Sequence, residues 1–240
     1  MKTFARALLV GAAMLATAPA HAITFAEFSG AAANWFSYTG ASTGGTLSGN
    51  TKVNFDGSAF GFDELAANTQ FTLTASSSTA PSAWANGDNA SQVFQTGTLT
   101  FTASNAFAAA HGGLTNLLTV TFTNGALNVT PLGSKNVGFT VTDGEEQFDG
   151  SVSTIGYTSD YFDFTGATDF DFAFSLTGAT KAIEATSNGG ALVNFKASGP
   201  GSFAAVAAIP EPDQWAMLLV GFGLVGSTMR RRRGMAIVTA

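Results

Sequence analysis

Residues 118–130 read Leu-Thr-Val-Thr-Phe-Thr-Asn-Gly-Ala-Leu-Asn-Val-Thr, and this stretch decides the fold class. Up to Thr123 the apolar residues alternate with threonine, which is the two-residue period of a strand with one buried and one exposed face. Threonine is β-branched and favours the extended backbone of a strand. Asn124-Gly125 between two such runs is the dipeptide most typical of a two-residue hairpin turn. The stretch therefore predicts two strands joined by a tight turn at Asn124-Gly125.

The same alternation recurs at residues 71–75, 99–103 and 170–176. Residues 137–142 run into Asp143-Gly144 in a similar way. From this repeated pattern we predict an all-β fold, an antiparallel β-sandwich of about eight to ten strands, jelly-roll-like or immunoglobulin-like in its layering.

The remaining segments of the domain carry weaker signals. Only residues 25–36 show any trace of a helical period. Glycine, serine, threonine, alanine and asparagine are concentrated at 40–49 and 76–89, which predicts long loops there. A last short strand is predicted at 202–206, and we treat 23–206 as one domain.

The N-terminus has the order of a secretory signal peptide. Lys2 and Arg6 form a positive region, residues 7–16 are apolar, and Ala20 and Ala22 offer a small-x-small cleavage site. This order predicts that residues 1–22 form a signal helix that signal peptidase removes.

The C-terminus has a short uncharged run at residues 215–229, which predicts a transmembrane helix. Fifteen residues make roughly 22 Å of helix, against about 30 Å of hydrocarbon, so the span is marginal. The basic cluster of Arg230, Arg231, Arg232 and Arg233 predicts a stop signal on the cytoplasmic side. The domain before the span is then exported, and the precursor is held transiently in the inner membrane.

The residues before this span carry a specific motif. Pro210-Glu211-Pro212, followed by Trp215 and Ala216, fits the pattern PEPxxWA. Together with the apolar run and the arginines, residues 207–240 resemble the PEP-CTERM sorting element of Gram-negative bacteria. The resemblance implies processing near the PEP triplet by an exosortase, a membrane-embedded protease or transpeptidase. The same element closes some ice-binding proteins, but it is an address and says nothing about ice.

Composition removes several classes of partner for the exported part of the chain. Residues 23–209 hold four lysines, no arginine and fourteen acidic residues, a net charge of −10. Nucleic acid and anionic lipid both need basic partners, so we expect neither. The chain has no cysteine, so no disulfide stabilises the domain.

Catalytic and metal-binding constellations are scarce, and we expect no enzyme. His111 is the only histidine left after the signal peptide, and no Gly-x-Ser-x-Gly elbow accompanies it. One histidine without cysteine disfavours zinc and copper. Glycoside cleavage needs only two carboxylates. The candidates are Asp56, Asp63, Glu64, Glu145, Glu146, Asp149, Asp160, Asp163, Asp169 and Asp171.

Calcium is the cofactor that these acids suit best, since it takes six to eight oxygen ligands. Asp143, Glu145, Glu146 and Asp149 supply four carboxylates within seven residues. Their spacing matches no EF-hand loop, and a solvated acidic turn is the favoured interpretation.

The Thr-x-Thr segments at 98–102 and 119–123 raise a further hypothesis, because a threonine array on a flat sheet can match the ice lattice. Such an array needs many strands in register, and the sequence has no constant repeat that predicts one. Threonine is also simply a good outward residue for antiparallel sheets. Ice binding is therefore a minor hypothesis.

Three functions from different classes remain. The first is a non-catalytic surface or matrix protein, processed by an exosortase and associated with exopolysaccharide, as the resemblance implies. The second is a carbohydrate-binding module, and the third is a glycoside-active enzyme that uses the acids above. For the second, the candidate sugar-stacking residues are Trp35, Tyr38, Trp84, Tyr157 and Tyr161.

Overall fold

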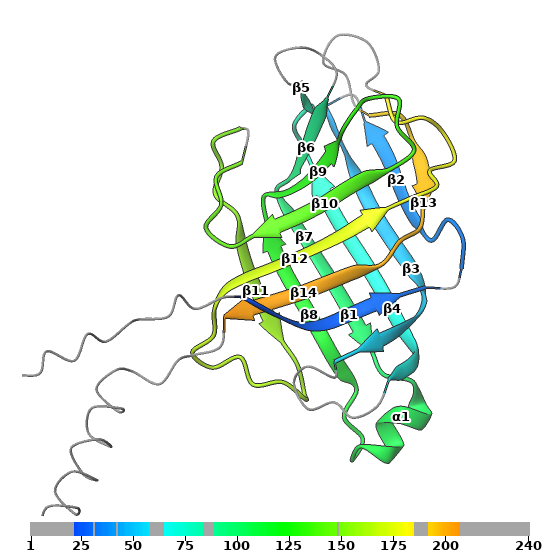
Figure 1. The fold of residues 1–240 in the computed structure, drawn as a ribbon, viewed down its shortest axis with the longest axis vertical. Coiled ribbons are helices and arrows are strands. Elements are labelled where there is room, and N and C mark those ends of the chain that lie inside the picture. The colour runs from blue at the N-terminus through cyan, green and yellow to red at the C-terminus, as the bar shows by residue number, and fades with distance from the viewer. Residues whose placement is uncertain are drawn as a thin grey trace, which may run out of the picture.

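The computed structural model describes residues 22–30, 32–41, 43–57, 65–83, 89–147, 149–184 and 192–206. These residues form fourteen strands and one short helix (Figure 1). The elements are β1 (Ile23–Ser29), β2 (Phe36–Ala41), β3 (Gly44–Asp56), β4 (Ala66–Ser77), β5 (Ser82–Ala83), β6 (Ala90–Phe94), β7 (Thr96–Thr102), α1 (Asn105–Ala110), β8 (Asn116–Thr123), β9 (Gly125–Val129), β10 (Val137–Thr142), β11 (Thr154–Thr158), β12 (Thr168–Leu176), β13 (Phe195–Ala197) and β14 (Gly201–Val206).

All the described strands belong to one antiparallel sheet that curls over on itself. The strand order is β11-β8-β7-β4-β3-β1-β14-β12-β10-β9-β6-β5, and β2 pairs with both β3 and β13. In Figure 1, β10, β12, β14 and β1 form the front layer. Strands β2, β3, β4, β7, β8 and β11 form the layer behind it and cross the front strands steeply. The two layers enclose the core.

Strand β3 joins the two layers on one side of the molecule. Its first six residues pair with β2, and its last three pair with β1. The register against β4 shifts between Val53 and Phe55, where the strand bends toward β1. A local irregularity of this kind lets a single strand serve both layers.

Two bent strands join the layers on the other side. Only Gln95 separates β6 from β7, and only Asn124 separates β8 from β9. Strand β6 pairs with β9, and β7 pairs with β8. The predicted hairpin at Asn124-Gly125 is therefore wrong, because β8 and β9 do not pair with each other. Asn124 has φ 55, so it does adopt the left-handed backbone of a turn residue, but it bends a strand from one layer into the other.

Packing at this corner explains its two glycines. A Cβ on Gly97 would lie 2.0 Å from Cζ of Phe122, and a Cβ on Gly125 would lie 2.8 Å from Cε2 of the same ring. The ring of Phe122 therefore occupies the space that side chains at these positions would need. It also meets the rings of Phe139 and Phe172 in the other layer, at centroid distances of 5.5 Å and 5.3 Å.

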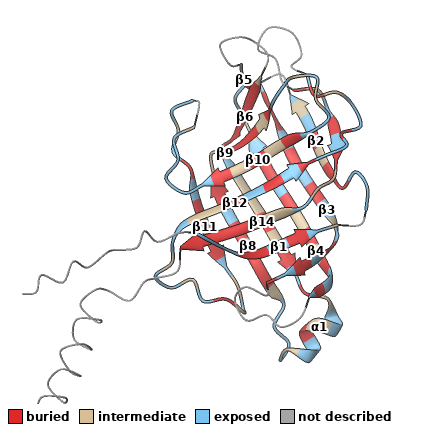
Figure 2. Cartoon of the chain, viewed as in Figure 1, coloured by how far each residue is buried: buried red, intermediate tan, exposed pale blue. Residues whose placement is uncertain are grey.

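Phenylalanine rings fill the space between the layers. Phe28 of the front layer lies 5.4 Å from Phe71 and 5.1 Å from Phe101 of the back layer, between ring centroids. Figure 2 shows the resulting alternation of buried and exposed residues along the strands. Aromatic rings bury large apolar areas and gain further energy from their packing geometry, so this core provides the stability that disulfides do not.

The structure confirms an all-β, antiparallel fold and corrects several details. Strands at 71–75, 99–103 and 170–176 lie within β4, β7 and β12, and the last strand is β14. The predicted jelly-roll-like or immunoglobulin-like subtype is not confirmed, since one sheet curls round the core.

The structure also decides two details of local structure. The trace of a helical period at 25–36 does not correspond to a helix, because residues 25–29 belong to β1, from which Phe25 and Phe28 point into the core and Glu27 and Ser29 point out. The predicted long loop at 40–49 is wrong for the described residues, because 40–41 lie in β2 and 44–49 lie in β3, and Ala41 pairs with Gly44. Helix α1 was not predicted, and the Ser104 side chain caps it by accepting from the Phe107 N–H.

Residues 1–21 of the predicted signal peptide, the sorting segment and the transmembrane span at 215–229 lie outside the described residues, and the predicted domain boundaries stay predictions. Among the described residues, no helix combines the length and apolar character needed to cross a membrane.

Candidate functional site

The outer surface of the front layer is hollowed into a groove of about 510 Å³. Small residues cause this hollow, since β10, β12 and β14 place glycine, alanine and serine where larger side chains would fill it. The groove is lined by Glu27, Phe28, Ser29, Asn54, Asp56, Leu65, Gly138, Phe139, Thr140, Ala173, Phe174, Ser175, Pro200, Gly201 and Ser202.

A row of cross-strand partners crosses the groove over five strands, and four of these strands contribute a polar side chain to it. Asp56 of β3 pairs with Glu27 of β1, and Glu27 pairs with Ser202 of β14. Ser202 in turn pairs with Ala173, which pairs with Thr140 of β10. Directly opposed residues on one face have their Cβ atoms about 4.5–5.5 Å apart. The row thus places two carboxylates side by side at one end and small hydroxyl side chains beyond them.

This pair of carboxylates sets the electrostatic character of the groove. Glu27 and Asp56 are direct cross-strand partners, so two acidic side chains lie side by side at this end of the groove. No basic residue lines the groove among the described residues. Ionised carboxylates only accept hydrogen bonds. The groove therefore suits a ligand that offers several hydrogen-bond donors and carries no negative charge.

Next to this row the sheet holds a partly buried acid. Asp171 of β12 lies beside Ala204 and Thr142, and burial raises the pKa of its carboxyl. The Tyr157 hydroxyl donates a hydrogen bond to the Asp171 carbonyl oxygen. Burial, and secondly the charge of Asp171, raise the pKa of Tyr157 far above its ordinary value. Tyr157 is therefore a neutral donor that ties β11 to β12.

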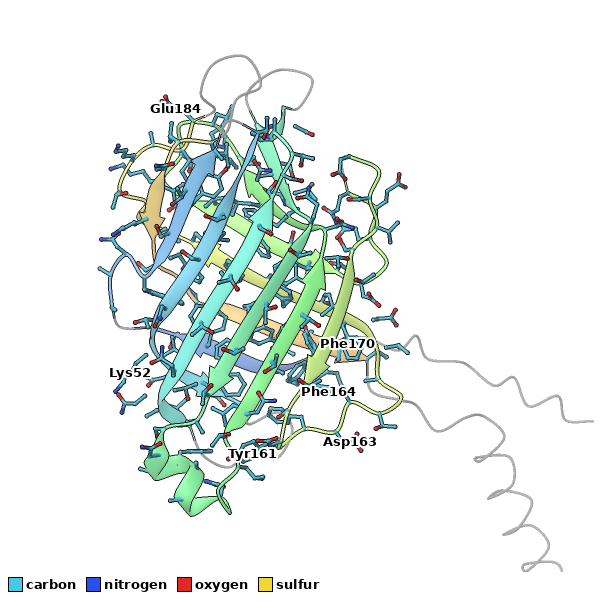
Figure 3. All side chains as sticks on the ribbon, turned by 180° about the vertical axis from the view of Figure 1, so that it is seen from behind. Lys52, Tyr161, Asp163, Phe164, Phe170 and Glu184 are labelled. Atoms are coloured by element: carbon cyan, nitrogen blue, oxygen red, sulfur yellow. The ribbon has the colours of Figure 1, made fainter. Side chains whose placement is uncertain are left out.

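The outer surface of the back layer is built differently, and we call the outward side chains of β4, β7, β8 and β11 the threonine face. Figure 3 shows these strands from outside. Lys52 of β3, labelled there, is the direct cross-strand neighbour of Gln70 and lies at the edge of the face. The threonine face consists of Gln70, Thr72, Thr74, Ser76, Thr96, Thr98, Thr100, Thr102, Asn116, Thr119, Thr121, Thr123, Thr154, Gly156 and Thr158. It carries no charged residue.

The strands of the threonine face are in register, so its hydroxyls form rows. One row runs from Thr74 through Thr98 to Thr121. The next row runs Thr72, Thr100, Thr119 and Thr158 across four strands. A shallow hollow of about 600 Å³ lies over β4, β7 and β8 of this face and extends onto the neighbouring strand β3.

Hydrogen bonds along the rows hold several of these hydroxyls in place. Thr123 Oγ1 lies 2.8 Å from Thr154 Oγ1, and Ser76 Oγ lies 3.0 Å from Thr96 Oγ1. Thr72 and Thr100 form a short hydroxyl–hydroxyl hydrogen bond. Cross-strand pairs of this kind stabilise a sheet by about 0.2–1 kcal/mol each.

The four acids of the predicted calcium loop do not converge. Asp143 accepts from the Ile155 N–H at 3.1 Å, and Asp149 accepts from the Ser151 N–H at 3.0 Å. Glu145 and Glu146 are exposed. Within the described part of the chain, no three acidic or histidine side chains form a group that could hold a metal ion. Calcium binding at this loop stays a prediction.

The other candidate acids are dispersed over turns and strands. Asp160 accepts from the N–H groups of Thr115 and Asn116 at 3.0 Å and 2.8 Å. Hydrogen bonds from the Thr165 side chain and backbone lower the pKa of Asp163. Asp169 accepts from the Thr168 hydroxyl at 3.1 Å. Of the ten candidates, Asp56 is the one that lines the groove, while Asp63 and Glu64 lie outside the described residues.

His111 ends helix α1. Its Nδ1 lies 2.9 Å from the Phe107 carbonyl oxygen, and its ring stacks on that phenylalanine at 4.2 Å. These contacts are those of a helix cap.

The candidate sugar-stacking aromatics do not form a platform among the described residues. Trp35, Tyr38 and Tyr157 are buried in the core. Burial raises the pKa of Tyr38 to about 12, and its hydroxyl donates to the Gly44 carbonyl oxygen at 3.2 Å. Tyr161 is half-buried and donates to the Leu114 carbonyl oxygen at 2.8 Å, and Trp84 lies outside the described residues.

Sequence reasoning missed Glu27, the residue at the centre of the acidic pair. The signal was present in residues 23–29, where Glu27 and Ser29 alternate with buried Phe25 and Phe28 apart from one irregularity at Ala26.

Comparison with known proteins identifies one segment. The family model of the PEP-CTERM protein-sorting motif matches residues 208–233. This match confirms the sorting element predicted from Pro210-Glu211-Pro212 and the arginine cluster. No curated protein matches the chain, and no solved structure does.

Proposed function

We propose that this chain, which carries the PEP-CTERM sorting motif at residues 208–233, is an exported surface or matrix protein that binds exopolysaccharide without catalysis. The motif is the observation that carries the proposal, since it implies export, a membrane-anchored precursor and processing by an exosortase. The signal-peptide order of residues 1–22 supports the same route. In this proposal residues 215–229 hold the precursor transiently in the inner membrane, and the durable product is the β domain on the cell surface or outside the cell.

The groove of the front layer supports the polysaccharide part of the proposal. Neighbouring hydroxyls of a sugar are donors, and Glu27 and Asp56 offer adjacent acceptors for them. Hydrogen bonds to charged groups are stronger than those between neutral groups. Asn54, which pairs with Ser29 in the same groove, adds an amide. A neutral polysaccharide fits this set better than an acidic one, because the groove lining is itself negative.

The two carboxylates of the groove are presented from one face of the sheet. Glycosidases place their two carboxyl groups on either side of the scissile bond. Glu27 and Asp56 are direct cross-strand partners on one sheet face, so both side chains leave the sheet in the same direction. A sugar in the groove would meet both from the same side.

Analysis of the protein's termini tests the export and processing proposal. We expect the protein recovered from the surface or medium of an exosortase-containing Gram-negative host to begin at Ile23 and to end within or near Pro210-Glu211-Pro212, as read by mass spectrometry. A variant with these three residues replaced by alanine should stay in the membrane fraction with its C-terminus intact. Mature native protein that still extends beyond Arg233 would contradict processing at the motif.

Binding to neutral exopolysaccharide, prepared from the same host, tests the groove. We expect Glu27→Gln to weaken binding about tenfold or more, because a hydrogen bond to a charged group contributes about 1.5–3 kcal/mol. Glu145→Gln is the matched control, since Glu145 is an exposed acid outside the groove and should bind as the native protein does. Equal binding by both variants would refute the groove, and release of shortened oligosaccharides would refute the non-catalytic role.

A further inference from the structure

The threonine face is a two-dimensional array with no role in the groove or in sorting. Strands β4 and β7 are paired over seven consecutive positions, from Gln70 with Thr102 to Ser76 with Thr96. Strand β8 continues the rows on the far side of β7, where Thr98 pairs with Thr121 and Thr100 with Thr119. The register that the sequence did not predict is therefore present over these three strands.

The sheet sets two repeat distances for this array. Neighbouring strands lie about 4.8 Å apart, and alternate residues along a strand lie about 6.7 Å apart. Oxygen–oxygen repeats on the prism surfaces of hexagonal ice fall in the same range. Strand twist accumulates across a sheet, so the match is best over the central strands β4, β7 and β8.

The side chains of the array are held before any ligand arrives. Threonine is restricted at χ1 by its β-branch, and the hydroxyl pairs Thr72–Thr100, Ser76–Thr96 and Thr123–Thr154 restrict it further. A surface that is already ordered loses little side-chain entropy on binding. Such order benefits a rigid, repeating partner most.

The composition of the face selects the chemistry of that partner. Exposed sheet faces commonly carry lysine and glutamate, which keep proteins soluble and separate. The threonine face has hydroxyl, methyl and amide groups only, apart from Gly156, although residues 23–209 include eighteen charged side chains. The nearest charge is that of Lys52, which pairs with Gln70 at the edge, so the rows of β4, β7 and β8 offer a charged ligand no complementary group and a sugar no aromatic ring to stack on.

We propose that the threonine face binds the surface of ice, with the rows of β4, β7 and β8 matched to the oxygen lattice. The inference rests on the register and composition of this face and is independent of the exopolysaccharide proposal. An uncharged, regular lattice of water is the partner that needs every property of the face together: fixed spacing, ordered hydroxyls and no charge.

The test uses the whole chain, exported and processed in an exosortase-containing host. We expect the purified protein to separate the melting and freezing temperatures of a small ice crystal in a nanolitre osmometer and to give the crystal facets. Thr74→Lys combined with Thr121→Lys should abolish both effects, because two long side chains would stand between the face and the ice. Both residues are exposed, so the double variant should fold, which circular dichroism checks.

Thr142→Lys is the matched control, an exposed threonine of β10 in the other layer, and it should keep full ice activity. Native protein that neither shapes ice nor separates the two temperatures would overturn the proposal, and so would a double variant that does both as well as the native protein. Light scattering near 0 °C tests the alternative that a second copy of the chain binds the threonine face, because it measures whether the protein is a dimer. A native dimer that the double variant loses, without any effect on ice, would assign the face to a second copy of the chain and overturn ice binding.

Discussion

Two aspartates of the same segment, Asp171 and Asp163, differ in how far they are buried. Asp171 is half-buried and its pKa is raised by desolvation, whereas Asp163 is exposed and its pKa is lowered by hydrogen bonds from Thr165. The two residues lie eight positions apart in an acidic segment that looks uniform in the sequence. Their environments decide how each responds to pH.

We predict that Asp171→Asn raises the free energy of unfolding at neutral pH. The folded state holds the Asp171 proton more tightly than the unfolded state, so native stability falls as pH rises from the ordinary aspartate range through the raised pKa. Asparagine removes this penalty. In urea unfolding at about pH 7 the variant should therefore have the higher free energy of unfolding. The difference from the native protein should shrink toward about pH 3, below the ordinary aspartate pKa of about 3.9.

Asp163→Asn is the control for this prediction. A lowered pKa means that the ionised Asp163 carboxylate stabilises the folded state at neutral pH, and solvent screening keeps this contribution small because the group is exposed. The variant should therefore be as stable as the native protein or slightly less stable at neutral pH. A loss of stability in Asp171→Asn at neutral pH would show that its carboxylate makes a stabilising contact that outweighs its desolvation.

At the scale of the element, the corner strands show how local and distant signals combine. Asn124-Gly125 has the backbone preference of a hairpin turn, and the structure uses that preference to bend one strand between layers. Whether this dipeptide forms a hairpin or a bend depends on β6 and β7. These two strands bend at Gln95, and β6 pairs with β9 while β7 pairs with β8. The dipeptide Asn124-Gly125 therefore predicts a bend in the chain, but it does not predict which strands pair with β8 and β9.

The corner makes Gly97 a position that accepts no side chain. We predict that Gly97→Ala lowers the free energy of unfolding by about 1–3 kcal/mol, the usual cost of overpacking, because its Cβ would overlap the Phe122 ring. Gly138→Ala is the matched control, since a Cβ on this β10 glycine meets nothing within 4 Å. Chemical denaturation of both variants measures the difference.

A second substitution checks the cause. Phe122→Ala should itself be destabilising through its cavity, but it should make Gly97→Ala nearly harmless in its background. Additive effects in this double-mutant cycle would mean that Gly97 is required for some reason other than the Phe122 ring.

For the whole molecule, the curled sheet separates two outer surfaces of opposite character. The groove draws on β1, β3, β10, β12 and β14, while the threonine face draws on β4, β7, β8 and β11 (Figures 1 and 3). No residue belongs to both. Distant, independent sites give additive effects, so Glu27→Gln should leave ice activity unchanged and the Thr74→Lys, Thr121→Lys double variant should leave exopolysaccharide binding unchanged.

The core explains why both surfaces are available. Phenylalanine rings from the two layers meet directly, as Phe28 does with Phe71 and Phe101, so the sheet forms its core by itself. Among the described residues, no helix covers either outer face (Figure 1). Sheet faces that stay open can carry specialised chemistry, here a negative groove on one side and an uncharged hydroxyl array on the other.

The sequence alone determined the features that depend on short-range order. The alternation at 71–75, 99–103 and 170–176 specified strands and their buried faces, because a period of two residues is set by the backbone itself. The sorting element at 208–233 was likewise readable, since its recognition depends on a contiguous order of motif, apolar run and arginines.

Only the tertiary structure decided which strands lie side by side. Asp56, Glu27 and Ser202 form one row although they come from the two ends and an inner part of the domain. Thr74, Thr98 and Thr121 form another across three strands, although the intervals between them are governed by loops and by helix α1. Register is fixed by how the core side chains of distant strands pack together. It depends on both strands of a pair, so it cannot be predicted from the sequence of either strand alone.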